Sequence, residues 1–374
     1  MSLRPLAGPQ ATARAWCGHL QRGWAATEVL VVLAATATAA VEGISAAGAT
    51  PGSRRRTAAA DAELLQLGPS GHRCHRLPPL PAGVTPALIS HVVLQGLGLQ
   101  ATVLDLGAPL APAIPHLRLP PPAGGGPAAC LSSGRAMPRR RVVALLERGR
   151  ALGQQPAAKA PLLLAESVPG GTTTALALLW GLGIEAHGLV SGSLRQPVHA
   201  LKSALVLRGL AAAGVAPGVA DPLAVVAAVG DPFQPLAAGL LLAAVAQGRP
   251  VVLAGGCQMA AVLALALALA TPAQRPRLTA LAAVATTGWV AREGGSDLAL
   301  LLNRIGQRWR VAPLGFAASL RFTAARQAPL RDYERGYVKE GVGAGGLALL
   351  WELAGRNPID LMQACDRACA RLHA

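Results

Sequence analysis

The sequence is poor in aromatic residues and in lysine. Phe, Trp and Tyr make up 3% of the 374 residues, and the only lysines are Lys159, Lys202 and Lys339. Proteins that bind single-stranded nucleic acid usually carry aromatic side chains among their basic residues. The net charge of +16 comes almost entirely from scattered arginines, which we interpret as compositional drift that accompanies the abundant Ala, Gly and Pro. The sequence therefore argues against a nucleic-acid partner.

Metal-ligand clusters and paired cysteine motifs are also lacking. The six cysteines include no Cys-x-x-Cys pair. Cys74 lies between His72 and His75, but the second half of a tetrahedral site is absent nearby. Reduced thiols are the default for a long chain without a cysteine-rich framework. We predict no metal site and no cofactor.

Long uninterrupted apolar runs are absent as well. The run over 29–41 is too short to span a bilayer, and the run over 251–270 is broken by Gly255-Gly256-Cys257-Gln258. The N-terminus carries Arg4 and Arg14 but no apolar core of a signal peptide before residue 28. These absences predict a cytoplasmic protein with no membrane partner.

The sequence does contain a regular alternation of short apolar runs and Ala/Leu-rich segments, clearest from residue 161 onward. The predicted strands are 28–33, 101–105, 162–165, 184–190, 223–229, 250–254 and 278–286, and the helices between them include 140–152, 172–182, 197–213, 236–247 and 258–269. This alternation indicates an α/β fold, a doubly wound, Rossmann-like parallel sheet. Residues 1–27 are predicted to be irregular, and the Pro/Gly-rich residues 107–138 to form one long loop.

The two ends of the chain depart from this alternation. Helices are predicted at 57–67 and 85–97 near the N-terminus, and at 347–354 and 358–372 near the C-terminus. We therefore predict a Rossmann-like α/β domain over 101–329 and a smaller, mainly helical region built from 1–100 plus 330–374.

The most informative stretch runs from Glu166 through Gly170 and Gly171 to Thr172. It follows an apolar run typical of a buried strand and opens an Ala/Leu-rich helix. Free N–H groups at the start of such a helix attract anions, phosphate above all. Glu166 beside this site suggests chemistry, because Ser or Asn would serve a purely structural role. A capped helix with an exposed glutamate is an equally weighted alternative.

Other turns of small residues follow the predicted strands. Ligands bind beyond the carboxyl ends of the strands of a doubly wound sheet, so one edge should gather Ser191-Gly192-Ser193, Gly230-Asp231, Gly255-Gly256 and Thr286-Thr287. Lys202, on the helix after Ser193, suits a phosphate contact, and a solvated helix face is the alternative. Asp231 would bind a ribose hydroxyl or cap the next helix, and capping is slightly favoured.

The run Gly341-x-Gly343-x-x-Gly346 matches the dinucleotide fingerprint literally. A true fingerprint follows the first strand of a βαβ unit, and too little chain remains here for the rest of a nucleotide domain. An NAD-dependent oxidoreductase is therefore kept only as an alternative. Lys339 and Glu340 precede the run, and burying both is costly unless they pair or serve a ligand. A surface salt bridge is the slightly favoured alternative.

Several segments, taken in order, resemble a divergent branch of the nicotinate-nucleotide:dimethylbenzimidazole phosphoribosyltransferases of cobalamin assembly. Residues 166–174 are similar to the family's Glu-Met-Gly-Ile-Gly-Asn-Thr-Thr segment, and residues 339–344 to its Gly-Glu-Gly-Ser-Gly-Ala segment. The turn at 190–193 with Lys202 resembles its glycine-rich turn and Arg-Lys helix. Residues 250–256 resemble its Pro-Val-hydrophobic-Asp-Gly-Phe segment, while 43–51 and 79–86 look like the divergent branch only.

This resemblance implies a reaction and roles for residues. The phosphoribosyl group of nicotinate mononucleotide would move to a nitrogen of an aromatic base such as 5,6-dimethylbenzimidazole, giving an α-riboside 5'-phosphate and nicotinate. Glu340 matches the family's catalytic base and Glu166 its second active-site glutamate, and the family usually forms a homodimer. With the shared sheet edge, the expected substrate-binding residues are Gly170, Gly171, Thr172, Ser191, Gly192, Lys202, Asp231, Gly255, Gly256 and Gly341.

The sequence departs from the family pattern on the acceptor side. Ala254 stands in place of the family's Asp, and Gly256 in place of its aromatic residue. The acceptor therefore stays open among dimethylbenzimidazole, adenine, a phenolic base or another compound. A non-catalytic nucleotide-binding protein that kept the fold is the competing hypothesis.

Overall fold

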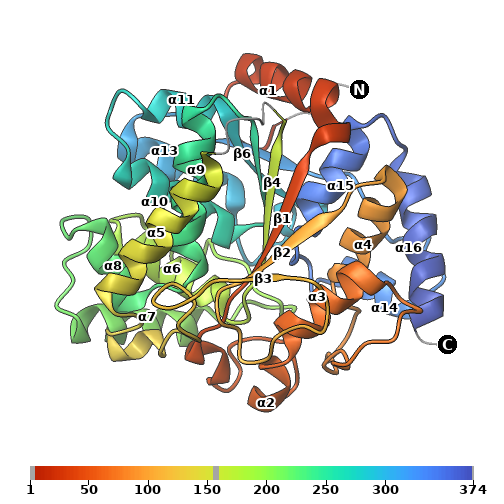
Figure 1. Ribbon diagram of the computed structural model, residues 1–374, viewed down its shortest axis with the longest axis horizontal. Helices are drawn as coiled ribbons and strands as arrows, with labels where there is room; N and C mark the ends of the chain where they lie inside the picture. The colour runs from red at the N-terminus through yellow and green to blue at the C-terminus, as the bar shows by residue number, and fades with distance from the viewer. Residues whose placement is uncertain (1–4, 155–159, 373–374) are drawn as a thin grey trace.

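The computed structural model describes residues 5–154 and 160–372. Its centre is a seven-stranded sheet in the order β3-β2-β1-β4-β5-β6-β7 (Figure 1). All six strand pairings are parallel. The strands are β1 (Glu28–Leu33), β2 (Ala101–Asp105), β3 (Leu117–Arg118), β4 (Leu162–Ser167), β5 (Val251–Ala254), β6 (Ala282–Thr286) and β7 (Leu314–Ala317). The prediction of a doubly wound parallel α/β sheet is confirmed.

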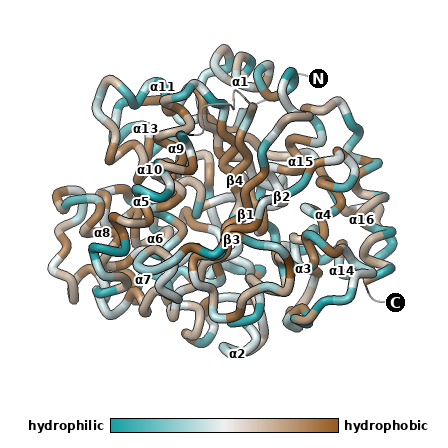
Figure 2. The backbone as a smooth tube through the Cα atoms, viewed as in Figure 1, coloured by the Kyte–Doolittle hydropathy of each residue, from teal (hydrophilic) through white to brown (hydrophobic). Residues whose placement is uncertain are grey.

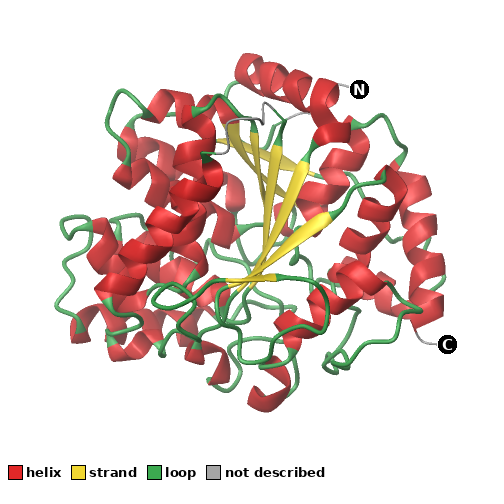
Figure 3. Cartoon of the chain, viewed as in Figure 1, coloured by secondary structure: helices red, strands yellow, loops and turns green. Residues whose placement is uncertain are grey.

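Helices cover both faces of the sheet, as Figures 1 and 3 show. One face packs against residues from α5 (Arg139–Gly153), α6 (Gly171–Gly181), α7 (His199–Ala212), α8 (Pro222–Val229), α9 (Phe233–Ala246), α10 (Cys257–Leu269), α11 (Arg275–Leu281) and α13 (Leu298–Trp309). The other face packs against α1 (Gln10–Gly23), α3 (Thr57–Leu67), α4 (Ala87–Leu97), α14 (Ala328–Glu334), α15 (Ala344–Leu353) and α16 (Pro358–Leu372). The remaining short helices are η1 (Trp24–Ala26), η2 (Ala37–Ala40), α2 (Pro51–Arg54), η3 (Leu131–Ser133) and α12 (Gly288–Ala291).

The strands are apolar on both sides because both sides are buried. In β1, Leu30 and Val32 belong to one core while Val31 and Leu33 belong to the other, as the alternation of side chains along a strand requires. Figure 2 shows the same central strands as an apolar band. Small residues on the strands and helices let the layers approach closely, so the core needs few aromatic side chains.

The strand order places a switch point between β1 and β4. The chain leaves β1 outward through β2 and β3 and then returns to β4 on the other side. The loops beyond two such neighbouring strands diverge and leave a crevice at their carboxyl ends. Val32 of β1 pairs with Glu166 of β4 in the register, so Glu166 lies at this crevice. Figure 3 shows loops gathered at the end of the sheet opposite α1.

Two of the predicted strands are wrong. Residues 223–229 belong to α8, where Asp221 caps the helix by accepting a hydrogen bond from the Leu223 N–H and Pro222 occupies the first turn. These start signals outweigh the β-branched valines that suggested a strand. Residues 184–190 form turns and loop. Their apolar side chains, those of Ile184, Ala186, Leu189 and Val190, are buried in the core, so the apolar pattern that suggested a strand reflects burial and not strand pairing.

Other element boundaries also differ from the prediction. The segment 278–286 becomes a strand only at Ala282, after α11, and residues 1–27 contain the amphipathic helix α1. One side of α1 buries Ala13, Trp16, Cys17 and Leu20, at the spacing of a helix face. The predicted long loop 107–138 contains the short β3 and η3, and β7 was not predicted.

The predicted smaller region combines segments from the two ends of the chain. Helices from both ends of the chain, including α3, α4, α15 and α16, do lie together on one face of the sheet. However, β1 falls within 1–100 and pairs with both β2 and β4 at the centre of the sheet. The proposed boundaries stay a prediction. Within 5–154 and 160–372, no helix combines the length and the apolar character that crossing a membrane requires.

Candidate active site

A cavity of about 660 Å³ lies at the carboxyl end of β4. Segments far apart in the sequence form its wall. They are the loop 45–47, the Pro-rich loop 71–86, the β4–α6 turn 166–172, the turn 191–193, the start of α10 at 256–258 and the segment 337–342. The cavity thus brings together nine of the expected site residues, namely Glu166, Gly170, Gly171, Thr172, Ser191, Gly192, Gly256, Glu340 and Gly341.

The β4–α6 turn directs a helix N-terminus at the cavity. Gly170 has φ 85°, and a Cβ at this position would lie 3.0 Å from the backbone nitrogen of Ala39. Only glycine fits both the backbone angle and the space. Helix α6 begins at the next residue, Gly171, and α10 begins at Cys257 on the same wall. The positive ends of two helix dipoles therefore face the cavity.

Glu166 lines the cavity and has no side-chain hydrogen-bond partner among the described residues. Burial, followed by the negative charge of Asp231, raises the pKa of Glu166 to about 8, while the backbone N–H of Val168 favours the charged form. A carboxyl group with this pKa changes its protonation state near neutral pH, as is common at functional sites.

Glu340 holds its carboxylate in a ring of donors. Its Oε2 accepts hydrogen bonds from Thr286 Oγ1 at 3.0 Å and from the Thr287 N–H at 2.8 Å. Its Oε1 accepts from the N–H groups of Gly341 at 3.0 Å and Gly345 at 3.1 Å. Burial raises the pKa of Glu340, and these donors oppose the rise.

The segment around Glu340 has an unusual backbone. Val338, Lys339 and Val342 have φ values of 64°, 62° and 51°. The left-handed region is a genuine outlier for β-branched residues and costs about 1–3 kcal/mol per residue. Such backbone strain is concentrated at functional sites. We call residues 338–343 the strained turn.

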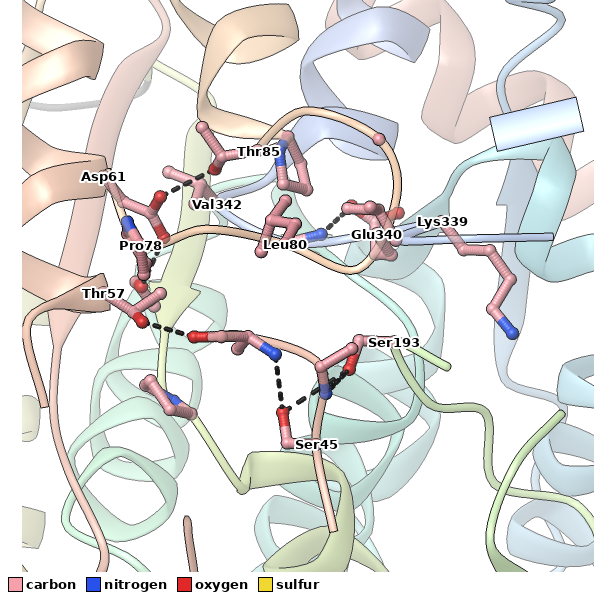
Figure 4. Close-up of a pocket in the computed structure, with 18 of the residues that line it drawn as sticks. Ser45, Thr57, Asp61, Pro78, Leu80, Thr85, Ser193, Lys339, Glu340 and Val342 are labelled. Atoms are coloured by element: carbon pink, nitrogen blue, oxygen red, sulfur yellow. Dashed lines mark hydrogen bonds between the residues drawn. The ribbon is translucent and has the colours of Figure 1, made fainter. Parts of the chain in front are cut away.

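Lys339 does not form the expected surface salt bridge with Glu340. Its amine pairs with Glu293 at 2.5 Å and donates a hydrogen bond to the Leu194 carbonyl at 2.9 Å. Figure 4 shows the side chain extending away from Glu340. Lys339 is 1% exposed, so it is a buried, paired lysine that fixes the strained turn to the loop after Ser193.

Three expected site residues lie behind the cavity wall and do not line it. The Lys202 amine donates to the carbonyl of Ser191 at 2.7 Å, and burial lowers its pKa to about 8. Asp231 is 0% exposed and caps α9 by accepting from the N–H groups of Phe233 and Gln234, which is the favoured alternative of the sequence analysis. Gly255 packs against Met259. These residues support the wall from outside the cavity.

A third carboxyl group on the cavity wall, that of Asp61, was not predicted from the sequence. Asp61 of α3 is 4% exposed and accepts a hydrogen bond from Thr85 Oγ1 at 2.6 Å (Figure 4). It accepts another from Ser167 Oγ at 3.0 Å. Burial raises its pKa to about 6, and these two hydroxyls oppose the rise. The sequence feature that could have indicated Asp61 is an acidic residue inside an Ala-rich helical segment. In the structure, this helix is buried on nearly all sides.

The Pro-rich loop over the cavity is anchored by a second buried carboxylate of α3. Glu63 is 0% exposed and accepts from the backbone N–H groups of His75 at 2.9 Å and Ala113 at 2.8 Å. It also contacts Nδ1 of His75 at 2.5 Å. His75 is therefore engaged by Glu63. Over 5–154 and 160–372, no three His, Cys, Asp or Glu side chains are grouped as a metal site would require.

The glycine run after Glu340 serves close packing. A Cβ at Gly343 would lie 2.6 Å from the Cβ of Ala165, and one at Gly346 would lie 2.3 Å from the Cβ of Ala254. The run leads from α14 into α15 and does not follow a strand, so the βαβ context of a dinucleotide fingerprint is missing. These glycines let α15 approach the ends of β4 and β5.

The chain is similar to one protein-family model and to several known proteins. The family model described as phosphoribosyltransferase (DBI_PRT) matches residues 89–280. A UPF0284 protein of Prochlorococcus marinus (strain MIT 9313) is 51% identical over 365 residues, which cover 96% of this chain and 89% of that protein. A UPF0284 protein of Gloeobacter violaceus is 46% identical over 362 residues, with 94% and 92% covered.

Two solved structures share the fold. A structure titled CobT from Thermus thermophilus superposes with a TM-score of 0.56 and 20% identity, covering 97% of this chain and 95% of that chain. A nicotinate-nucleotide-dimethylbenzimidazole phosphoribosyltransferase from the same organism gives a TM-score of 0.54 and 22% identity, with 92% and 83% covered. At these identities the similarity concerns the fold alone.

Proposed function

Since the chain belongs to the nicotinate-nucleotide:dimethylbenzimidazole type of phosphoribosyltransferase family, in a branch with the UPF0284 proteins, we propose that it transfers phosphoribosyl groups. The donor is nicotinate mononucleotide, and the acceptor is an aromatic N-heterocycle such as 5,6-dimethylbenzimidazole. The products are an α-riboside 5'-phosphate and nicotinate. One observation carries the proposal, namely two carboxyl groups, Glu166 and Glu340, on the wall of a cavity that also receives the N-terminus of α6.

The donor phosphate is proposed to bind at the start of α6 and at the turn 191–193. Backbone N–H groups and the helix dipole favour an anion there. The Lys202 amine fixes the turn by donating a hydrogen bond to the carbonyl of Ser191. Arg73 and Arg76 on the Pro-rich loop add positive charge to the same cavity. That charge suits a substrate with both a phosphate and a carboxylate.

The chemistry requires two contributions from carboxyl groups. Departure of nicotinate leaves an oxocarbenium-like sugar, and a nearby carboxylate stabilises that positive charge. The attacking nitrogen heterocycle must also lose a proton, which a positioned carboxylate accepts. Nicotinate leaves as an uncharged pyridine ring that bears its own carboxylate, so the leaving group needs no general acid. Glu166 and Glu340 are proposed to serve these two needs.

The acceptor is proposed to lie under the Pro-rich loop. Leu77, Leu80 and Val84 of this loop and Val338 of the strained turn line the cavity. These apolar side chains suit the flat faces of an aromatic ring. Dimethylbenzimidazole, adenine and a phenolic base all fit this description. A role in cobalamin lower-ligand activation, a cytoplasmic location and a homodimer remain parts of the proposal.

The decisive experiment is to incubate the purified protein with nicotinate mononucleotide and a panel of bases. Mass spectrometry would identify α-ribosyl phosphates, and chromatography would measure released nicotinate. Glu147→Gln, on the exposed side of α5, is the matched control and should react like the unaltered protein. The competing hypothesis of a non-catalytic nucleotide-binding protein predicts that calorimetry detects binding of nicotinate mononucleotide while no base releases nicotinate. That result would refute the transferase proposal.

A further inference from the structure

We propose that Asp61 selects an acceptor that carries a hydrogen-bond donor, such as an amino or hydroxyl group, on the ring edge opposite the reacting nitrogen. The proposal rests on the proposed function and narrows its acceptor. It follows from the bonding of the Asp61 carboxylate, from its lack of a cationic partner among the described residues and from its place on the cavity wall.

The Asp61 carboxylate keeps acceptor capacity that no described residue uses. Its Oδ1 accepts one hydrogen bond, from Thr85 Oγ1, and its Oδ2 accepts one, from Ser167 Oγ. An ionised carboxylate offers about four lone-pair sites and no donor, so about two sites remain. Asp61, Thr85 and Ser167 all line the cavity. A ligand in the cavity that donates a hydrogen bond can use one of the remaining sites.

The charge of Asp61 is also left without a cation. The ion pairs among the described residues do not include this carboxyl group. Asp61 is 4% exposed, and burying a carboxylate without a cation is costly. Its pKa of about 6 means that the group is mainly ionised at neutral pH. A donor group on a bound ring would offset part of this cost.

The packing of α3 does not require a charge at this position. The helix packs through small apolar side chains here, because Ala59, Ala60 and Ala62 are all buried. The two hydroxyls that bind Asp61 could also be held by a neutral asparagine, since an amide oxygen has two lone pairs. The charge of Asp61 is therefore better explained by a ligand than by the fold.

The position of Asp61 suits the far edge of an acceptor ring. The family resemblance implies that Glu340 takes the proton of the reacting nitrogen. Figure 4 shows Asp61 and Glu340 on opposite sides of Leu80. Leu80 lines the cavity and suits the flat face of an aromatic ring. A ring that lies on Leu80 with its reacting nitrogen at Glu340 directs its opposite edge toward Asp61.

The chemistry of that edge then separates acceptors. The methyl groups of 5,6-dimethylbenzimidazole cannot donate a hydrogen bond, so they would remove water from the Asp61 carboxylate without replacing it. A hydroxyl or amino group at the same place donates to the carboxylate, and hydrogen bonds to a charged partner are the stronger class. The apolar faces of the cavity accept both kinds of ring, whereas Asp61 discriminates between them.

The test compares 5-hydroxybenzimidazole with 5-methylbenzimidazole, which differ in one substituent of similar size. Nicotinate release at saturating nicotinate mononucleotide gives kcat/KM for each acceptor, and the readout is the ratio of the two values. We expect the unaltered protein to favour the hydroxyl compound by about 10–100-fold, the size expected for a hydrogen bond to a charged group. Asp61→Leu should bring the ratio to about one or below, because leucine offers no acceptor. Asp61→Asn should lower the ratio part of the way, since its amide accepts without a charge.

Glu147→Gln is the matched control and should keep the ratio of the unaltered protein. A purely structural role of Asp61 would lower both values equally and leave the ratio unchanged, and that result overturns the proposal. An unaltered protein that uses the two acceptors equally well overturns it too. If Asp61→Leu does not fold, the ratio of Asp61→Asn decides. If no base releases nicotinate with the unaltered protein, the proposed function fails instead.

Discussion

The backbone carbonyl oxygen of Glu166 accepts a hydrogen bond of 3.1 Å from the N–H of Val342. This bond joins the end of β4 to the strained turn near the other end of the chain. The same turn carries Glu340, whose carboxylate is bonded in turn to the end of β6. Hydrogen bonds therefore connect the segments that carry the two glutamates, and a substitution in either segment should alter the position of the other.

The contact between Gly343 and β4 makes a specific stability prediction. Gly343→Ala should destabilise the protein by about 3–5 kcal/mol, because a Cβ at φ 77° would also lie 2.6 Å from the Cβ of Ala165. Gly355 has nearly the same φ, 78°, with nothing within 4 Å of its Cβ position. Gly355→Ala should cost only about 1–2 kcal/mol for the backbone angle. Equal losses in denaturant unfolding would show that α15 does not pack tightly on β4.

The buried Glu63 makes a second prediction. Glu63→Ala leaves two backbone N–H groups and His75 without their acceptor and should cost about 3–5 kcal/mol. The exposed Glu147 pairs with Arg150 on the same helix, and changing Glu147 to alanine should cost about 0–0.5 kcal/mol. Because Glu63 anchors the Pro-rich loop, a milder Glu63→Gln change should raise the KM for the acceptor more than that for the donor. An unchanged acceptor KM would contradict this role of the loop.

Glu166 predicts a pH dependence of stability. Its pKa rises from the ordinary 4.5 to about 8 in the folded protein, so folding favours the protonated form. This contribution is fully present below about pH 4.5 and is lost as the pH rises through about 8. Glu166→Gln should therefore be more stable than the unaltered protein by about 1–3 kcal/mol above pH 8, a figure reduced for partial solvation in the cavity.

The two proteins should converge in stability near pH 4.5. Melting temperatures between pH 4.5 and 9 would measure the difference. Glu185→Gln provides the control, because the Glu185 side chain is 88% exposed and should show no such trend. A Glu166→Gln advantage that is constant across the pH range would argue against a raised pKa.

Asp231 should tune the pKa of Glu166 from behind the cavity wall. Its negative charge is the largest contribution after burial. Asp231→Asn should therefore lower, by up to about one unit, the pH at which the stability advantage of Glu166→Gln develops, since the neutral side chain no longer opposes ionisation of Glu166. Asp221→Asn, at the exposed cap of α8, should leave that pH unchanged. A shift toward higher pH would have the wrong sign for this coupling.

The sequence predicted the β4–α6 turn and the sheet edge because those features are local. This turn can be recognised from one continuous segment, which contains the apolar run at 162–165, the glycines at 170 and 171 and the helix after them. Asp61 was missed because its partners Thr85 and Ser167 meet only in the folded chain. Likewise, no local pattern predicts the four hydrogen-bond donors around the Glu340 carboxylate, because two of them come from the distant Thr286 and Thr287.

The misplaced strand at 223–229 has a different cause. Val225, Val226 and Val229 favour strands intrinsically, yet Asp221 and Pro222 provide a strong helix start. The short β3 and β7 were not predicted because edge strands need only a few residues paired on one side. The sheet type was therefore predictable from the overall alternation, whereas individual outer elements were decided by packing.

The strained turn has a consequence for the order in which this protein is made. The ribosome delivers Glu166 with β4 long before the turn at 338–343 emerges, and the cavity wall is incomplete until α15 docks against the ends of β4, β5 and β6. A nascent chain thus contains Glu166 well before the segment that completes the cavity wall beside it. Synthesis of the strained turn and α15 is the step that completes this wall.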